Sequence, residues 1–239
     1  MFVLGLTGSI GMGKSTAAAL LRRLGLPVHD ADAAVHRLLA AGGAAVSPVL
    51  AAFPDVAASD GGIDRRALGR QVFRDGTALK RLEAILHPLV RAEALRFLAR
   101  QQRLGAAVVI LDIPLLYETG GEALCDAVIV VTAPAWLQAQ RVLRRPGMTP
   151  ETFAAIKAKQ LPDAEKRRRA DVLVQTGLGK GDTLRRLRRI ARVAAGCEGE
   201  AWPPRSGLQP LLAKTLASGG QGPGGQGPDG QAAGSKREA

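Results

Sequence analysis

The sequence predicts an α/β fold, in which helices cover both faces of a doubly wound parallel sheet. Three observations indicate this fold. Short apolar runs alternate with segments of helical spacing up to about residue 195. Residues 106–111 and 125–132 are strand-like apolar runs with β-branched residues, as is typical of parallel strands buried on both faces. A glycine-rich segment, residues 8–15, joins the first apolar run to the first helical segment.

The glycine-rich segment matches the pattern G-x-x-x-x-G-K-[ST], which is typical of loops that bind nucleotide phosphates. It lies between the predicted strand 2–7 and the predicted helix 16–24, which is the order that such a loop requires. Lys14 can reach the β- and γ-phosphates, and the hydroxyl of Ser15 can bind Mg²⁺. The backbone N–H groups expected to hold the triphosphate of ATP are those of Gly11, Met12, Gly13, Lys14, Ser15 and Thr16.

Helical segments fill the chain between a second short strand, residues 26–30, and the third strand. This block, residues 33–103, is predicted to be an insertion that lies over the carboxyl ends of the strands, where ligands bind. Asp64 is expected to cap one of its helices. A long helical run, residues 77–103, contains Pro88, and we expect two helices that meet near residue 87 because proline interrupts helical hydrogen bonding.

The remaining elements alternate in the same way. Helices are expected over residues 134–144, 153–160 and 163–169, followed by a last strand at 170–174 and a basic helix that ends near residue 195. Beyond about residue 198 the composition changes, with a glycine, glutamine and proline stretch at residues 219–234, so residues 198–239 are predicted to be a disordered tail without a catalytic role. Within it, only Trp202 and residues 208–216 are candidates for weak docking on the body.

Composition narrows the class of protein. The chain of 239 residues is 46% hydrophobic but only 3% aromatic, which predicts an aliphatic core. Two cysteines are too few for a disulfide framework, which favours a reducing compartment. A membrane span needs about 18 consecutive apolar residues, and no stretch of the sequence has them. We therefore expect a cytoplasmic protein with no membrane partner. The net charge of +12 indicates an anionic partner, either a polyanion or a small phosphorylated ligand, unless it reflects only a preference for arginine.

Three groups of side chains outside the loop are candidates for chemistry. Asp32 follows the second strand, where a phosphate acceptor needs a base or an orienting group; alternatively it caps the next helix. Arg141 shares a helix face with Arg145, and such arginines either clamp phosphates or form a solvated basic surface. Asp112 ends a buried strand and is either an acid on the metal side or a strand-end cap.

With these features the chain resembles the dephospho-coenzyme A kinase family over about residues 2–195. Two departures from the family pattern are Ser9, where glycine is usual, and Gln175-Thr-Gly177 in place of Asn-x-Gly. The segments that carry the resemblance are Leu6-Thr-Gly-Ser-Ile-Gly-Met-Gly-Lys-Ser-Thr16, Asp30-Ala-Asp32, Leu86-His-Pro88, Asp112-Ile-Pro-Leu-Leu-Tyr-Glu118, Gln140-Arg141 and Lys159-Gln-Leu-Pro-Asp-Ala-Glu-Lys-Arg-Arg-Arg-Ala-Asp171.

The resemblance implies a P-loop kinase-like enzyme of three parts within residues 1–197. The core would comprise residues 1–32, 104–139 and 170–197, with the insertion 33–103 binding the coenzyme A precursor and residues 140–169 forming a lid.

The implied reaction is transfer of the γ-phosphoryl group of ATP, with Mg²⁺, to the ribose 3′-hydroxyl of dephospho-coenzyme A. Lys14, Asp32 and Arg141 would be catalytic, and Asp32, His87 and Leu115 would bind the acceptor. On the residues alone, His87 before Pro88 indicates a helix junction instead. Another small-molecule or nucleotide kinase of this fold is the alternative, followed by a nucleic-acid-binding NTPase; no nucleic-acid partner is expected, because aromatic stacking platforms and recognition motifs are missing from the sequence.

Overall fold

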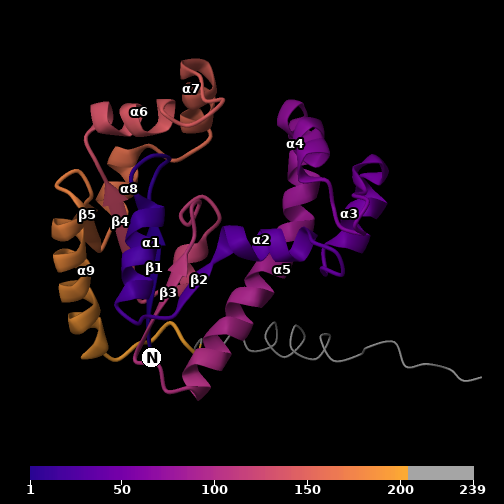
Figure 1. Ribbon diagram of the computed structural model, residues 1–239. Helices are drawn as coiled ribbons and strands as arrows, with labels where there is room; N and C mark the ends of the chain where they lie inside the picture. Colours follow the sequence, from indigo (N-terminus) through magenta and orange to yellow (C-terminus); the bar gives the residue numbers. More distant parts are fainter. Residues whose placement is uncertain (204–239) are drawn as a thin grey trace, which may run out of the picture.

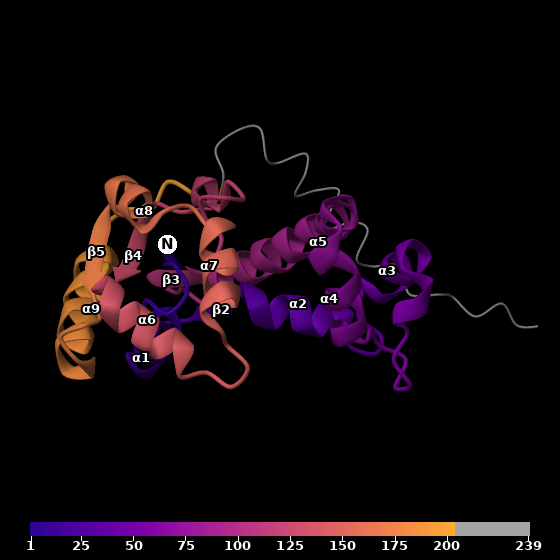
Figure 2. The same ribbon diagram turned by 90° about the horizontal axis from the view of Figure 1, so that it is seen from above.

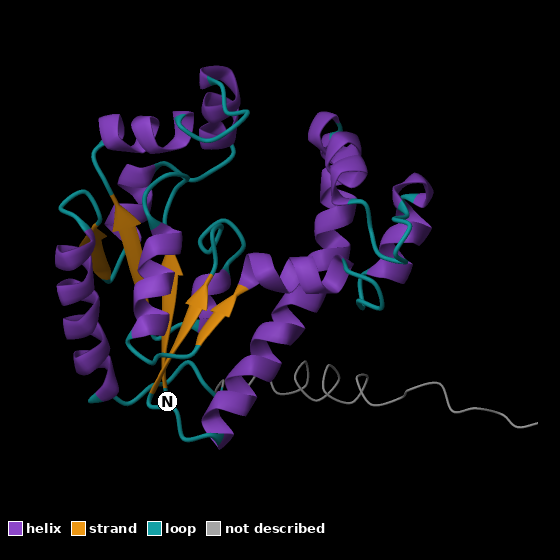
Figure 3. Cartoon of the chain, in the orientation of Figure 1, coloured by secondary structure: helices purple, strands orange, loops and turns teal. Residues whose placement is uncertain are grey.

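The computed structural model describes residues 1–203 and contains a five-stranded parallel sheet in the order β2-β3-β1-β4-β5 (Figures 1 and 3). This arrangement confirms the α/β class predicted from the alternating pattern. The central strand β1 pairs with β3 on one side and with β4 on the other, so the segment after β1 leaves the middle of the sheet. The strands are β1 (Phe2–Thr7), β2 (Val28–Asp30), β3 (Val108–Asp112), β4 (Ala127–Thr132) and β5 (Val172–Gln175).

Helices cover both faces of the sheet because the strand residues are apolar on both sides. On one face, alternate residues such as Leu4 and Ile129 pack against α1 (Lys14–Arg23) and α9 (Lys180–Ala195). On the other face, residues such as Val109 pack against the carboxyl-terminal half of α5 (Gly76–Arg103), and α8 (Asp163–Arg169) lies beside β4. The core is aliphatic, as the composition indicated.

The insertion between β2 and β3 stands to one side of the sheet, next to β2 (Figures 1 and 2). Its apolar residues form a hydrophobic cluster of their own, so it buries a small second core. The insertion contains α2 (Ala31–Leu39), α3 (Val46–Ala52), η1 (Pro54–Val56), α4 (Arg65–Arg74) and the first half of α5. As expected, the Asp64 side chain caps α4 by accepting hydrogen bonds from Arg66 N and Ala67 N.

The prediction of two helices meeting near residue 87 is wrong, because α5 is a single helix of 28 residues that contains Pro88. Packing on both sides of the proline accounts for its continuity. Leu82, before the proline, belongs to the core of the insertion, whereas Leu95 and Leu98, after it, pack on the sheet. Such tertiary packing outweighs the local cost of a proline in a helix.

The segment predicted to be a lid contains the end of α6 (Ala135–Leu143), α7 (Pro150–Ala158) and α8. Figure 1 shows α6 and α7 beyond the carboxyl ends of the strands, on the same side as the loop that follows β1. The 3-10 helix η2 (Gly121–Leu124) precedes β4. Across residues 1–203, none of the helices combines the length and the apolar composition needed to cross a bilayer.

The expectation of disorder from residue 198 onward needs a correction at residues 198–203. Asp126 accepts hydrogen bonds from Val3 N, Glu200 N and Ala201 N, which fastens this segment to the start of β1. Trp202 is only 6% exposed and donates from Nε1 to Gln102 Oε1 at 2.8 Å. Residues 198–203 are therefore packed on the rest of the protein. The remainder of the predicted tail, residues 204–239, lies outside the described residues.

Candidate active site

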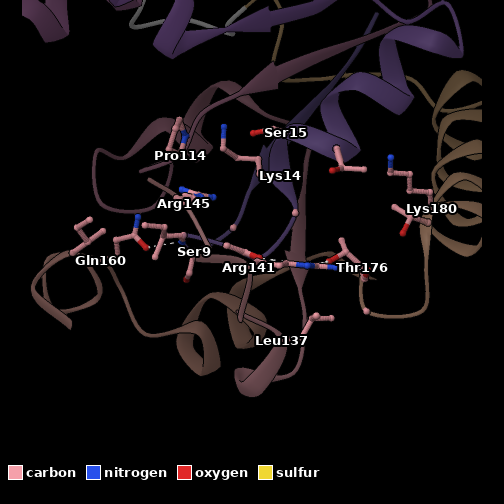
Figure 4. A pocket seen from close by; sticks show the side chains of 18 of the residues that line it. Ser9, Lys14, Ser15, Pro114, Leu137, Arg141, Arg145, Gln160, Thr176 and Lys180 are labelled. Carbon is pink, nitrogen blue, oxygen red and sulfur yellow. Dashed lines mark hydrogen bonds between the residues drawn. The ribbon is translucent and has the colours of Figure 1, made fainter. Parts of the chain in front are cut away.

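A cleft of about 640 Å³ lies at the carboxyl ends of β1 and β3, above the loop of residues 8–15 (Figure 4). We call it the donor cleft. The labelled side chains in Figure 4 come from the loop and the start of α1, from the segment after β3, from α6 and the residues just beyond it, from the segment between α7 and α8, and from the segment after β5 up to the start of α9. The lining residues are Gly8, Ser9, Ile10, Gly11, Gly13, Lys14, Ser15, Thr16, Asp32, Pro114, Leu137, Arg141, Arg145, Ile156, Gln160, Thr176, Gly177, Gly179, Lys180 and Thr183.

The loop has the conformation that its glycines allow. Gly13 has a φ of 95°, and a Cβ atom there would lie 2.8 Å from Thr176 Oγ1. The helix α1 begins at the next residue, Lys14, so its free N–H groups face the donor cleft. A helix start with free N–H groups is a site for anions such as phosphate. Of the six residues predicted to bind the triphosphate, five line the donor cleft, whereas the side chain of Met12 is buried in the core.

Lys14 and Asp112 form an ion pair across the top of β1 and β3. Lys14 Nζ lies 2.7 Å from Asp112 Oδ1, and Asp112 is only 2% exposed. Burial raises the pKa of Asp112, while the Lys14 ammonium opposes that rise. The strand-end acid therefore holds the lysine at the floor of the donor cleft, next to the hydroxyl of Ser15.

Arg141 is fixed beside the loop by Thr176. Its Nη1 donates to Thr176 Oγ1 at 2.9 Å and to Gly11 O at 3.4 Å, and its Nη2 donates to Thr176 O at 3.0 Å. The hydroxyl of Thr176 donates in turn to Met12 O at 2.7 Å. Thr176 stands at the variable position of the family's Asn-x-Gly pattern, in which Gln175 replaces the asparagine, so its contact with Arg141 was not predicted from the sequence. Arg145 also lines the donor cleft, but it lies beyond the end of α6 at Leu143, so the two arginines do not share a helix face as expected.

A second pocket, of about 390 Å³, lies between the insertion and the sheet. We call it the acceptor pocket. It brings together Asp32, His87 and Leu115, the three acceptor residues implied by the resemblance, and its walls are mostly aliphatic. Its lining residues are His29, Ala31, Asp32, Val35, Leu79, Leu82, Glu83, Leu86, His87, Val90, Arg91, Ala94, Ile113, Pro114, Leu115, Thr119, Gly121 and Leu124.

Asp32 and Pro114 line both the donor cleft and the acceptor pocket. The capping role that we considered for Asp32 belongs to Asp30, whose carboxylate accepts a hydrogen bond from Ala33 N at 3.0 Å. Asp32 lies in the first turn of α2, and its side chain is exposed. Its carboxylate is therefore placed where two bound molecules would meet.

His29 is a residue of the acceptor pocket that sequence reasoning missed. It is 5% exposed, its ring centroid lies 5.4 Å from that of Phe97, and its Nε2 has no hydrogen-bond partner among the described residues. Burial lowers the pKa of His29, so the imidazole is held in its neutral form. A histidine in a strand-like apolar run gives no sign of this position.

Comparisons with known proteins agree with this geometry. A model of the dephospho-CoA kinase (CoaE) family matches residues 2–179. A dephospho-CoA kinase of Paramagnetospirillum magneticum is 67% identical over 167 residues, which cover 70% of this chain and 78% of the relative. One of Rhodospirillum rubrum is 62% identical over 187 residues, which cover 78% of this chain and 88% of the relative.

Two solved structures have the same fold. The Thermus thermophilus protein TT1252 superposes with a TM-score of 0.69 at 39% identity, covering 83% of this chain and 98% of that one. The dephospho-CoA kinase from Campylobacter jejuni superposes with a TM-score of 0.58 at 24% identity, covering 82% of this chain and 98% of that one.

Proposed function

The chain belongs to the dephospho-CoA kinase family, and we propose that its two pockets hold the two substrates of that reaction. ATP would occupy the donor cleft, and dephospho-coenzyme A would occupy the acceptor pocket. The reaction transfers the γ-phosphoryl group of ATP to the 3′-hydroxyl of the ribose and completes the synthesis of coenzyme A. The observation that carries the proposal is that Asp32 lines both pockets, so it can contact an acceptor hydroxyl and face the γ-phosphate.

The floor of the donor cleft supplies the positive charge that phosphoryl transfer requires. The N–H groups at the start of α1 and the ammonium of Lys14 would bind the β- and γ-phosphates. The Ser15 hydroxyl lines the donor cleft, and the Asp112 carboxylate lies beneath it, paired with Lys14. Both are hard oxygen donors of the kind that Mg²⁺ prefers, so they would hold this ion. When bound, the ion supplies positive charge to the phosphate oxygens.

Asp32 would accept a hydrogen bond from the 3′-hydroxyl and orient its oxygen toward the γ-phosphorus. Alignment of this kind accounts for much of the rate of phosphoryl transfer, which needs little covalent chemistry from the protein. In the acceptor pocket, His87 and Leu115 would contact the body of the acceptor.

Arg141 would meet the charge that develops on the transferring group. Its three hydrogen bonds to Thr176 and Gly11 leave two of its five N–H groups for phosphate oxygens. Closure of α7 over the donor cleft would exclude water and so limit the hydrolysis of ATP. We place the reaction in the cytoplasm, since the free thiols of Cys125 and Cys197 fit a reducing compartment.

The test is ADP release by the whole protein with ATP, Mg²⁺ and one acceptor at a time. We expect turnover with dephospho-coenzyme A and a product that carries the new phosphate on the 3′-oxygen, as identified by NMR. Nucleosides, nucleoside monophosphates and shikimate serve as comparison acceptors. Faster turnover with one of these would assign the acceptor pocket to a different small molecule, and salt-sensitive binding of DNA or RNA without any kinase activity would contradict the proposal.

A further inference from the structure

The loop that follows β3, residues 113–124, forms one wall of the acceptor pocket. We call it the acceptor loop. Ile113, Leu115 and Thr119 line the pocket, and Pro114 also reaches the donor cleft. A molecule in the acceptor pocket would therefore contact this loop, whereas none of the described residues that line the pocket belongs to the lid.

Glu118, in the acceptor loop, contacts two residues of the lid, Leu161 and Lys166. Its Oε1 lies 2.8 Å from Lys166 Nζ and accepts a hydrogen bond from Leu161 N, also at 2.8 Å. Lys166 also donates to Pro114 O at 3.4 Å, so one ammonium contacts the loop at two points. The acceptor loop is thereby attached to the lid at two places, at Leu161 between α7 and α8 and at Lys166 within α8.

The same part of the lid also contacts the phosphate-binding loop. Gln160 Oε1 accepts a hydrogen bond from Ile10 N at 3.0 Å (Figure 4). Gln160 and Leu161 are consecutive, so neighbouring residues of the lid hold the donor side and the acceptor side. A displacement of the acceptor loop would therefore displace Leu161 and Gln160 of the lid through their connection to Glu118.

Stability alone does not explain the pair of Glu118 and Lys166. The side chain of Lys166 is 0% exposed, and taking an ammonium out of water is costly even when it is paired. Apolar residues of similar volume would often be as stable or more so. Burial acts to raise the pKa of Glu118, but hydrogen bonds from Lys166 and Leu161 N outweigh burial, so the pKa is lowered and the carboxylate stays charged at neutral pH.

We propose that Glu118 and Lys166 are positioning residues that couple occupancy of the acceptor pocket to closure of the lid over ATP. The inference rests on the proposed function, because it takes the acceptor pocket as the site of dephospho-coenzyme A. Its consequence is that the γ-phosphoryl group of ATP passes to the acceptor hydroxyl, with release of ADP, rather than to water, since the lid closes fully only when the acceptor loop is in place.

The test compares the amounts of ADP and coenzyme A formed in one reaction by the whole protein. The wild-type ratio is expected to be close to one. In Lys166→Met and Glu118→Gln, transfer should fall by about 5- to 100-fold, the usual range of coupling between two sites, with little change in the KM for ATP. The ratio of ADP to coenzyme A should rise well above one, because the lid would close whether or not the acceptor pocket is occupied and ATP would then be hydrolysed.

Glu165→Gln is the matched control. It removes a carboxylate from the same helix, but its partners Arg168 and Arg169 lie on the surface, so the ratio should remain that of the wild type. The double variant Glu118→Gln/Lys166→Met leaves no unpaired buried charge and guards against a single variant that fails to fold. In that variant, a normal melting temperature with a raised ratio would support coupling.

A normal melting temperature with the wild-type ratio in the double variant would overturn the inference, because the charges would then have only a structural role. The proposed function fails in a different way. If the wild-type protein did not phosphorylate dephospho-coenzyme A at all, the assignment of the acceptor pocket would be wrong, and the coupling would fall with it.

Discussion

The donor cleft and the acceptor pocket meet at Asp32, but the chain builds them in different ways. The floor of the donor cleft is one contiguous segment, residues 8–16, fixed between a central strand and the helix that follows it. The acceptor pocket draws its walls from β2 and α2, from α5 and from the acceptor loop, which are far apart in the sequence. The donor side is polar and locally determined, whereas the acceptor side is apolar and depends on tertiary packing.

This difference indicates which substitutions should affect the binding of one substrate and not that of the other. A change in the loop of residues 8–15 should alter the handling of ATP and leave the acceptor unaffected. A change in the wall of the acceptor pocket should do the reverse. A carboxylate that belongs to both pockets should slow the reaction while each substrate still binds.

Asp32→Asn gives the largest effect that this comparison predicts. Turnover should fall by about 10²-fold or more, which is typical for the loss of a base or orienting group. Binding of ATP and of dephospho-coenzyme A, measured by calorimetry, should change little. Asp30→Asn is the control, because asparagine still caps α2 and Asp30 lines neither pocket. Near-normal turnover of Asp32→Asn would remove this carboxylate from the mechanism.

Gly13→Ala should damage the donor cleft alone. The new Cβ atom would meet Thr176 at a backbone φ of 95°, and strain of this kind costs about 1–3 kcal/mol. We expect ATP binding to weaken by about 10- to 100-fold, as measured by titration with a fluorescent ATP analogue. An equal loss of dephospho-coenzyme A binding would show that the two sites are not built independently.

Leu115→Ala should affect the acceptor pocket alone. The loss of apolar contact should raise the KM for dephospho-coenzyme A by about three- to tenfold and leave the KM for ATP unchanged. Leu143→Ala, at a similarly exposed leucine on α6 outside both pockets, is the control in the same steady-state assay. A rise in the KM for ATP would contradict the separation of the pockets.

Ending the chain after Pro203 should have no measurable effect on either pocket. Each described residue of the two pockets precedes residue 184, and the family match ends at residue 179. A chain that ends after Glu198 loses Trp202 as well, and loss of a buried tryptophan costs about 3–5 kcal/mol. Thermal unfolding and turnover of the two truncated proteins would separate these cases, and lost turnover in the longer one would reveal a role for residues 204–239.

Sequence reasoning was strongest where local geometry decides the structure. The spacing of Gly8, Gly11, Gly13 and Lys14 is itself the geometry of a phosphate-binding loop, so the motif predicts the floor of the donor cleft, though not the walls that distant segments supply. The buried strands were predictable because continuous β-branched runs suit a parallel sheet.

Contacts between distant segments have no such local signal. Glu118 and Lys166 are 48 positions apart, and nothing near either residue indicates that the other is its partner. The continuity of α5 through Pro88 was missed for the same reason, since packing partners elsewhere in the chain decide it. Trp202 was expected to dock only weakly, and its burial is likewise decided by distant partners. The resemblance to a family placed His87 and Leu115 in the acceptor pocket, but residue patterns alone did not.

The strand order β2-β3-β1 has a consequence for how the protein is made. The strand that leads to the phosphate-binding loop and the strand that leads to Asp32 never pair with each other; β3 lies between them and pairs with both. Yet β3 is synthesised last of the three, after the whole insertion. The phosphate-binding loop and Asp32 are therefore both synthesised before the strand that sets their separation, and the catalytic spacing arises only when residues 108–112 enter the sheet.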